Sequence, residues 1–309
     1  MPTLPAQPND EPIKVPITLV DPDALVHSFE QLGYIASRSL ATAVYLSFRL
    51  RKPLLIEGHA GLGKTEVAKI LASILKTQLI RLQCYEGLDV NSSVYEWNYQ
   101  KQLLAIKIQE GTEQSVEEKE RHIFSRDFLL ERPLLQSILA QDASPVLLID
   151  EIDRADEAFE AFLLELLSDY QISIPEMGTI HARHVPYVIL TSNRTRELSD
   201  ALKRRCLYHW IEYPSFEKEM RIVRARLPGI EQELSRQVVH FIQAVRQLEL
   251  DKPPGVAETL DFAQALVSLR SQHLNADAID EAMGCVAKSM EDGAKLRAAR
   301  IDKLLSQTS

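Results

Sequence analysis

Short apolar runs alternate with helix-length stretches through the first two thirds of the chain. The runs lie at residues 54–57, 79–83, 145–150, 186–192 and 206–212, and most of them are continuously apolar. Strands that are apolar on both faces are typical of a parallel sheet that helices cover on both sides. The pattern therefore predicts an α/β fold built on a five-stranded parallel sheet.

The pattern changes after residue 213, where helical periodicity replaces the strand pattern. This change predicts an α/β domain over residues 17–213 and a small α-helical domain over residues 214–309. Residues 1–16 are rich in Pro, Asn and Asp and have little periodicity, which predicts a loose N-terminal arm.

The segments between the predicted strands carry patterns of their own. Residues 21–49 predict two helices separated at Gly33, and residues 157–170 predict an amphipathic helix. Residues 171–181 alternate between apolar and polar positions around a proline and a glycine, which predicts a hairpin.

The first strand runs directly into Gly58 to Thr65, which has the form G-x-x-x-x-G-K-T and precedes a helical stretch. Glycines let backbone N–H groups turn inward around a phosphate, and a helix N-terminus adds its dipole. Lys64 would reach the β- and γ-phosphate oxygens, and the Thr65 hydroxyl would bind Mg2+. An ordinary glycine-rich turn is the alternative, but the signature and both flanking elements favour a phosphate-binding loop. The candidate nucleotide contacts are Gly58, His59, Ala60, Gly61, Leu62, Gly63, Lys64, Thr65 and Glu66.

Polar residues end two of the apolar strands. Asp150 and Glu151 end the run that begins at residue 145, and Asn193 follows the run over residues 186–192. The carboxyl ends of parallel strands share one edge of the sheet, where ligands bind in open α/β folds. Asp150 is the candidate Mg2+ ligand, Glu151 would polarise the attacking water, and Asn193 would orient that water. The alternative is that the acids are simply solvated and that the asparagine caps a turn.

A short helix with a basic end is predicted over residues 199–205. Ser199 is its candidate N-cap, and Arg204 and Arg205 close its last turn. Cations at this end suit the helix dipole without any further role. The functional alternative is that Arg204 or Arg205 reaches the γ-phosphate held by a neighbouring subunit, as an arginine finger that stabilises transition-state charge. Hydrolysis would then depend on assembly.

Taken together, these motifs resemble the AAA+ ATPases and, within them, the MoxR branch. The residues that carry the resemblance are Gly58 to Thr65, the phrase D-E-I-D-R-A at residues 150–155, Asn193 and the Arg204-Arg205 pair. The segments at residues 33–36, 84–90 and 95–99 are similar to the CoxD-like group of this branch. The likeness extends over residues 20–305, which is nearly the whole chain.

The resemblance implies an αβα sandwich followed by a helical lid, with ATP and Mg2+ as cofactors. It implies a hexameric ring that remodels a client protein, namely a molybdenum-containing CO dehydrogenase-type enzyme awaiting its metal centre. A protein with a von Willebrand A domain is implied as a possible partner. Tyr34 and Ile35 would contact adenine, although plain helix packing accounts equally well for Tyr34.

Two accessory elements are also implied by the resemblance. Residues 85–132 are similar to a helix-2 insert, and residues 171–181 are similar to a pre-sensor hairpin. Aromatic residues of the insert, which include Trp97 and Tyr99, would either grip a client polypeptide or pack inward.

One position departs from the family pattern. Many AAA+ proteins carry a sensor-2 arginine at the start of a lid helix, where this chain has Glu258. A carboxylate cannot stabilise phosphate charge, so either another arginine substitutes for it or the lid senses nucleotide differently.

Composition narrows the classes of function. The formal net charge of -9 argues against a generic nucleic-acid surface, although an acidic protein can still contain a basic pore. The first residues do not resemble a secretion signal, and no apolar run has the length of a membrane span, so we expect a cytoplasmic protein.

The cysteine and histidine positions favour neither a disulfide framework nor a metal site. The three cysteines are widely separated. Cys206 follows two arginines, which would lower its pKa, but a buried strand residue is the favoured interpretation. His181 and His184 would lie on opposite faces of a strand, which argues against shared ligation.

Three functions compete at this stage. An ATP-driven remodelling ATPase of the MoxR type accounts for all the motifs. A nucleic-acid-dependent AAA+ motor is the second, and the acidic charge argues against it. A regulatory module that binds ATP without hydrolysing it is the third, and Glu258 makes it conceivable, whereas Glu151 and Asn193 argue against it.

Overall fold

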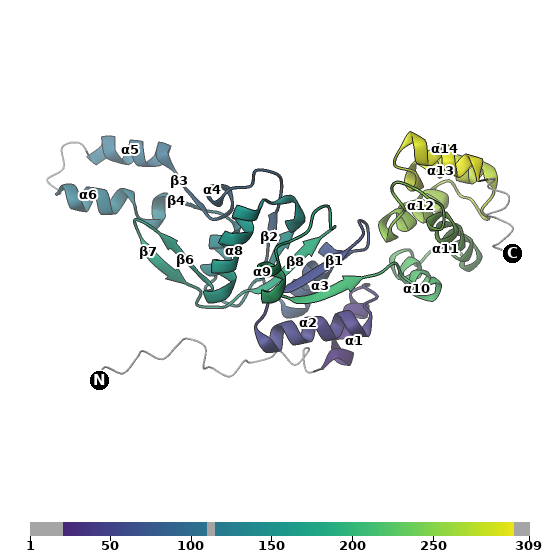
Figure 1. The fold of residues 1–309 in the computed structure, drawn as a ribbon, viewed down its shortest axis with the longest axis horizontal. Helices are drawn as coiled ribbons and strands as arrows, with labels where there is room; N and C mark the ends of the chain where they lie inside the picture. The colour runs from purple at the N-terminus through teal and green to yellow at the C-terminus, as the bar shows by residue number, and fades with distance from the viewer. Residues whose placement is uncertain (1–20, 110–114, 300–309) are drawn as a thin grey trace.

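Five parallel strands form the central sheet of the computed structural model, which describes residues 21–109 and 115–299 (Figure 1). Neighbouring strands are parallel throughout. The order across the sheet is β2 (Leu79–Gln83), β5 (Val146–Asp150), β8 (Tyr187–Ser192), β1 (Leu54–Gly58) and β9 (Leu207–Ile211). The predicted α/β fold with a five-stranded parallel sheet is confirmed. The predicted arm over residues 1–16 lies outside the described residues.

Helices cover both faces of this sheet. Leu54 and Ile56 of β1 share one apolar core with three helices, and Leu55 shares a second core with three others. Successive side chains of a strand point to opposite faces, so a continuously apolar strand contributes to both cores. The helices of the first face are α1 (Pro22–Gln31), α2 (Arg38–Leu50) and α3 (Lys64–Leu75), and those of the second are α7 (Pro133–Ile138), α8 (Glu157–Asp169) and α9 (Asp200–Arg205).

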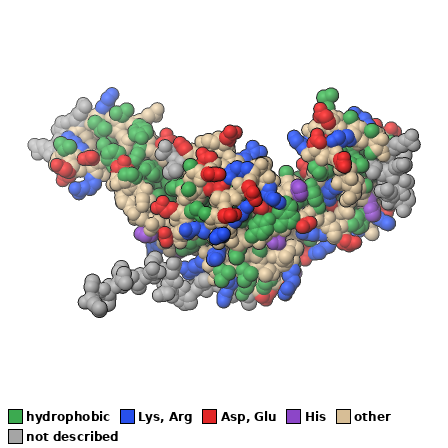
Figure 2. Space-filling view, in the orientation of Figure 1, with side chains coloured by type: hydrophobic (Ala, Val, Ile, Leu, Met, Phe, Trp, Pro, Cys, Tyr) green, Lys and Arg blue, Asp and Glu red, His purple; other side chains and the backbone are tan. Residues whose placement is uncertain are grey.

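Between β2 and α7 the chain forms an insert that extends away from the sheet. Its strands pair in antiparallel fashion, and its two longer helices lie at one end of the molecule (Figure 1). Figure 2 shows hydrophobic side chains gathered at this end. The elements are α4 (Val90–Ser93), β3 (Tyr95–Trp97), α5 (Tyr99–Gln109), α6 (Val116–Ile123), the 3-10 helix η2 (Arg126–Phe128) and β4 (Leu129–Glu131).

A separate hairpin follows α8. Its strands β6 (Gln171–Ile174) and β7 (Gly178–His181) pair in antiparallel fashion, which confirms the hairpin predicted over residues 171–181. A short 3-10 helix, η3 (Ile152–Arg154), connects β5 to the start of α8.

The C-terminal helices pack around a core of their own, at the end of the molecule opposite to α5 and α6 (Figure 1). They are α10 (Phe216–Arg226), α11 (Gln232–Arg246), α12 (Val256–Ser268), α13 (Ala276–Val286) and α14 (Met290–Ala298). A buried ion pair joins Arg246 of α11 to Glu219 of α10, with 2.6 Å between Nη2 and Oε1. The domain limits at residues 16 and 213 stay predictions. Within the part of the chain that the structure describes, no helix has the length and apolar character to cross a membrane.

Candidate active site

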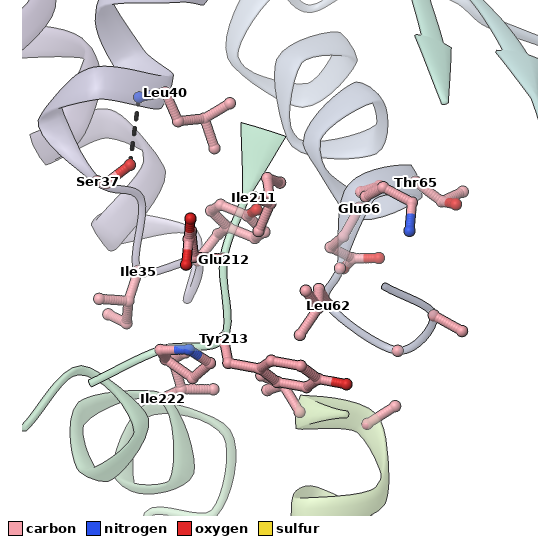
Figure 3. Close-up of a pocket in the computed structure, with 18 of the residues that line it drawn as sticks. Ile35, Ser37, Leu40, Leu62, Thr65, Glu66, Ile211, Glu212, Tyr213 and Ile222 are labelled. Carbon is pink, nitrogen blue, oxygen red and sulfur yellow. Dashed lines mark hydrogen bonds between the residues drawn. The ribbon is translucent and has the colours of Figure 1, made fainter. Parts of the chain in front are cut away.

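A cavity of about 660 Å³ lies where the carboxyl ends of the strands meet the C-terminal helices. Figure 3 shows Ile35, Leu62 and Ile222 around this space, on three different elements of the chain. Its lining joins the turn after α1, the Gly58 to Thr65 loop, the ends of β5, β8 and β9, and the start of the C-terminal helices. This position, at the carboxyl edge of a parallel sheet, is where ligands bind in open α/β folds.

Backbone geometry explains the glycines of the Gly58 to Thr65 loop. Gly61 and Gly63 have φ values of 74° and 80°, which side chains other than hydrogen rarely allow. A Cβ on Gly58 would lie 2.6 Å from the carbonyl oxygen of Ile211, so a side chain there would push β1 and β9 apart. The loop therefore keeps its amide groups around the space that a phosphate would occupy.

Lys64, the first residue of α3, folds back onto this loop. Its Nζ donates hydrogen bonds of 2.7 Å to the carbonyl oxygens of Gly58 and His59. Burial lowers the pKa of Lys64 to about 8, and the acids Asp153 and Asp150 offset part of that effect. The ammonium group is thus held at the phosphate loop by two neutral acceptors.

Thr65 and Asp150 meet at the floor of the cavity. The Thr65 hydroxyl donates a 3.0 Å hydrogen bond to Oδ1 of Asp150, and Thr191 of β8 donates to the same oxygen. The donor set suits Mg2+, which prefers hydroxyl, carboxylate and water oxygens. Thr65 and Asp150 are therefore the residues that would hold this ion, whose charge would neutralise that of the phosphates.

Glu151 lines the cavity in a left-handed backbone conformation, with φ of 54°. Gln83 of β2 donates a 3.1 Å hydrogen bond to its Oε2, and Arg154 lies 2.9 Å from the same oxygen. The backbone N–H of Glu151 donates to the Thr191 hydroxyl at 3.0 Å. These contacts fix the carboxylate beside the cavity, where it can accept a proton from water.

Asn193 also lines the cavity, because β8 lies between β5 and β1. Asp153, which is buried, accepts the backbone N–H of Asn193 at 3.2 Å and that of Thr195 at 2.8 Å. Asp153, the last acid of the D-E-I-D phrase, thus holds the loop that carries Asn193. Sequence reasoning assigned no role to Asp153.

Arg204 and Arg205 lie outside the cavity. Both are exposed at the end of α9, and neither side chain forms a hydrogen bond or ion pair with any residue that the structure describes. Ser199 caps α9, and its hydroxyl accepts the Leu202 N–H at 3.3 Å. An exposed, unengaged basic end is what an arginine offered to a neighbouring subunit would require.

The two candidate adenine contacts lie beside the cavity. Tyr34 and Ile35 both line the cavity, and the Tyr34 ring also packs against Phe29 of α1 at 5.4 Å between centroids. Burial raises the pKa of the Tyr34 hydroxyl. The helix packing of Tyr34 is confirmed, and its contact with adenine stays a prediction.

The other loop residues divide into two groups. Ala60, Leu62 and Glu66 line the cavity, and their contact with nucleotide stays a prediction. His59 does not: its ring stacks on Tyr213 at 5.0 Å, while its carbonyl oxygen accepts from Lys64. His59 thus contributes to the loop through its backbone and to the junction with α10 through its ring.

Glu258 acts as a helix cap at the start of α12. Its Oε2 accepts the Gly255 N–H at 2.9 Å, and the Ala257 N–H donates to the Gly61 carbonyl at 3.0 Å. Within the described residues, the arginine that lines the cavity is Arg226 of α10, which lies 3.6 Å from Glu66. Arg246 is instead fully engaged with Glu219.

The thiol and imidazole candidates behave as structural residues. Burial raises the pKa of Cys206 to about 12, which is opposite in direction to the lowering that two preceding arginines would cause. Cys206 lies just before β9 rather than within it. His184 contacts the Gln141 carbonyl at 2.9 Å, and across residues 21–109 and 115–299 no group of His, Cys, Asp and Glu side chains is arranged to hold a metal ion by itself.

Two functional positions on β2 escaped sequence reasoning. Arg81 and Gln83 contact Asp150 and Glu151, respectively. The alternation of β2, with Ile80 and Leu82 buried, was visible in the sequence and places Arg81 and Gln83 on the same face. The sequence did not reveal that β5 pairs with β2, because the two strands are far apart along the chain.

The chain is similar in part to known proteins. Residues 53–206 match the family described as AAA domain (dynein-related subfamily). An uncharacterized protein of Staphylococcus epidermidis is 25% identical over 229 residues, which is 72% of this chain and 78% of that protein. Among solved structures, the Thermotoga maritima RuvB Holliday junction branch migration motor is 18% identical with a TM-score of 0.46, over 80% of this chain and 67% of that one. A mutant of that RuvB is 16% identical with a TM-score of 0.47, over 87% and 72% of the two chains.

Proposed function

Because the chain carries an AAA domain and is an ATPase that uses ATP with Mg2+, we propose that it is a MoxR-type remodelling ATPase that works as a ring. AAA+ proteins typically oligomerise. In this proposal, hydrolysis at the cavity drives movements that act on a client protein, and the chemistry is completed by an arginine from the neighbouring subunit.

The observation that carries the proposal is the division of the catalytic set. Lys64, Thr65, Asp150, Glu151 and Asn193 all lie around one cavity. The two candidate finger arginines lie outside it and are exposed. One chain therefore supplies the general base, Glu151, but no arginine finger to the same cavity. This arrangement favours a site that is shared between two subunits.

Each side chain then has one task. Lys64 and the loop amides bind the phosphates, and Thr65 with Asp150 holds the ion beside them. Glu151 accepts the proton of the attacking water, and Asn193 orients this water. Arg204 or Arg205 of an adjacent subunit stabilises the charge that develops on the γ-phosphate.

The insert supports a client-binding role. Tyr99, Leu103, Leu104 and Ile108 of α5 are 59–70% exposed, an unusual density of apolar side chains for one surface helix. Trp97, in contrast, is buried against Phe124, so it packs inward and does not grip a client. We propose that α5 contacts the client polypeptide.

The likeness to the CoxD-like group suggests which client this is. The D-E-I-D-R-A phrase and the segments at residues 33–36, 84–90 and 95–99 support a role in maturing the metal centre of a molybdenum-containing CO dehydrogenase-type enzyme. A von Willebrand A domain protein is the proposed partner, and a hexamer is the proposed assembly. The assignment would be supported if the wild-type protein copurifies with such an enzyme and the L103S/L104S variant, which is altered in α5, does not.

Mixing two inactive variants tests the shared site. The E151Q protein keeps its finger arginines, and the R204A/R205A protein keeps its base. If the site is shared, each variant alone is inactive in ATP hydrolysis, and the mixture regains turnover in mixed rings. A mixture of E151Q with K64A is the control, because neither protein then provides a site with both base and phosphate-binding lysine.

Light scattering of E151Q with and without Mg-ATP gives the assembly state directly. A nucleotide-dependent shift to a ring supports the proposal. Full turnover by a strictly monomeric wild-type protein would refute it.

A further inference from the structure

The buried carboxylate of Asp150 has a cationic partner on the edge strand of the sheet. Arg81 of β2 donates to Oδ2 of Asp150 through Nε at 3.1 Å and through Nη2 at 2.5 Å. The other oxygen, Oδ1, accepts the hydroxyls of Thr65 and Thr191. One oxygen of Asp150 therefore faces the phosphate loop and the other faces a guanidinium.

The two partners differ sharply in exposure. The Asp150 side chain is 4% exposed, whereas the Arg81 side chain is 49% exposed. A buried carboxylate requires a counter-charge, since burial of an unpaired charge is costly. Arg81 is on β2, the edge strand, so it can turn into solvent with little disturbance of packing.

Arg81 also reaches the second acid indirectly. Its Nη2 donates to Oε1 of Gln83, and Nε2 of Gln83 donates to Glu151 at 3.1 Å. Because Arg81 and Gln83 are two positions apart on one strand, they lie on the same face and contact the two acids as a pair.

We propose that Arg81 is a positioning residue that supplies the counter-charge of Asp150 when no metal is bound, and that it thereby sets the Mg2+ concentration at which nucleotide is held. The guanidinium and a divalent cation stabilise the same carboxylate, so they compete. Arg81 keeps the acid from repelling phosphates in the metal-free site, and it weakens the pull of Asp150 on the ion. The inference rests on the proposed roles of Thr65 and Asp150.

The test is equilibrium binding of the fluorescent nucleotide mant-ADP, which requires no hydrolysis. In EDTA, R81Q should bind mant-ADP about threefold to tenfold more weakly than wild type, because Asp150 is then uncompensated. In a Mg2+ titration, the midpoint for R81Q should lie about fivefold lower than for wild type, for the same electrostatic reason. R81K, which keeps the charge but loses the planar fork, should fall between the two proteins.

Matched variants separate the possible outcomes. R126Q removes an arginine of similar exposure, 51%, that pairs with Glu131 in the insert, and it should leave both measurements unchanged. D150N should abolish the Mg2+ enhancement of binding, and an enhancement that survives in D150N would overturn the metal assignment together with this inference. Loss of enhancement in D150N with an unchanged or higher midpoint in R81Q and R81K would overturn the role of Arg81 alone.

Discussion

Replacing Gly255 by alanine should separate the C-terminal helices from the phosphate loop. Gly255 precedes α12 and lies against the loop so closely that a Cβ would meet the Ala60 carbonyl oxygen at 2.6 Å and the Gly61 Cα at 2.9 Å. Both obstacles are backbone atoms, so no side chain can rotate away. The φ of Gly255 is -82°, which alanine adopts freely, so the effect is steric and not conformational.

The magnitude follows from two contributions. Forcing one extra methyl group into a packed contact costs about 1–3 kcal/mol. Loss of the hydrogen bond from the Ala257 N–H to the Gly61 carbonyl adds about 1 kcal/mol. If nucleotide binding requires the closed contact, the lower limit of this sum, ~2 kcal/mol, weakens the affinity for nucleotide about 30-fold.

The assay is the dissociation constant for mant-ADP with Mg2+, measured for G255A, wild type and a control. Gly229 is the matched control, because a Cβ there would meet no atom within 4 Å and its φ is not positive. G229A should bind as wild type does. Wild-type affinity in a folded G255A protein would refute the reasoning that the α12 contact supports the nucleotide site.

Three further outcomes are expected. The pKa of Lys64 in the folded protein, about 8, lies below its ordinary value of 10.5, so the cation is lost first in the folded state. Nucleotide affinity should therefore fall as the pH rises through about 8. The contribution of Lys64 to the free energy of unfolding should rise between pH 8 and 10.5, because the unfolded chain binds more protons than the folded one in that range. K64R should abolish this pH dependence in a binding titration, and a flat wild-type profile between pH 7 and 9.5 would contradict the assignment. R246M should lower the free energy of unfolding by about 3–5 kcal/mol in urea denaturation, because it leaves Glu219 buried without its partner; a smaller loss in the E219Q/R246M double variant is the check on that cause. R205A or R204A should abolish turnover while leaving mant-ADP binding intact, and normal turnover in both single variants would remove the finger from α9.

The phosphate loop and the strand ends were the most predictable parts of the protein. Their function depends on residues that are contiguous in the chain. A G-x-x-x-x-G-K-T loop, the strand before it and the helix after it form one local unit that a sequence pattern can identify. The placement of Asp150, Glu151 and Asn193 at one edge of the sheet was also predictable, because the carboxyl ends of parallel strands share that edge. The structure places β8, which precedes Asn193, between β5 and β1.

Contacts between distant segments were beyond the reach of sequence reasoning. Glu258 was identified as a departure from the family pattern, but its role as a cap at a glycine contact depends on how α12 meets the loop. Trp97 is a second example. An aromatic side chain suits client binding, but the packing of the insert buries this one.

The sequence by itself determined the fold class, the phosphate-binding loop and the identity of the acids, because periodicity and short motifs act over neighbouring residues. Only the tertiary structure decided that Arg81 neutralises Asp150, that Arg204 and Arg205 stay outside the cavity, and that Gly255 touches Gly61. These facts depend on the register between β2 and β5 and on the docking of α12, which are set by packing among residues far apart in the chain. A local sequence pattern predicts on which face of a strand or helix a charged side chain lies. The packing of distant segments decides with which residue that side chain pairs.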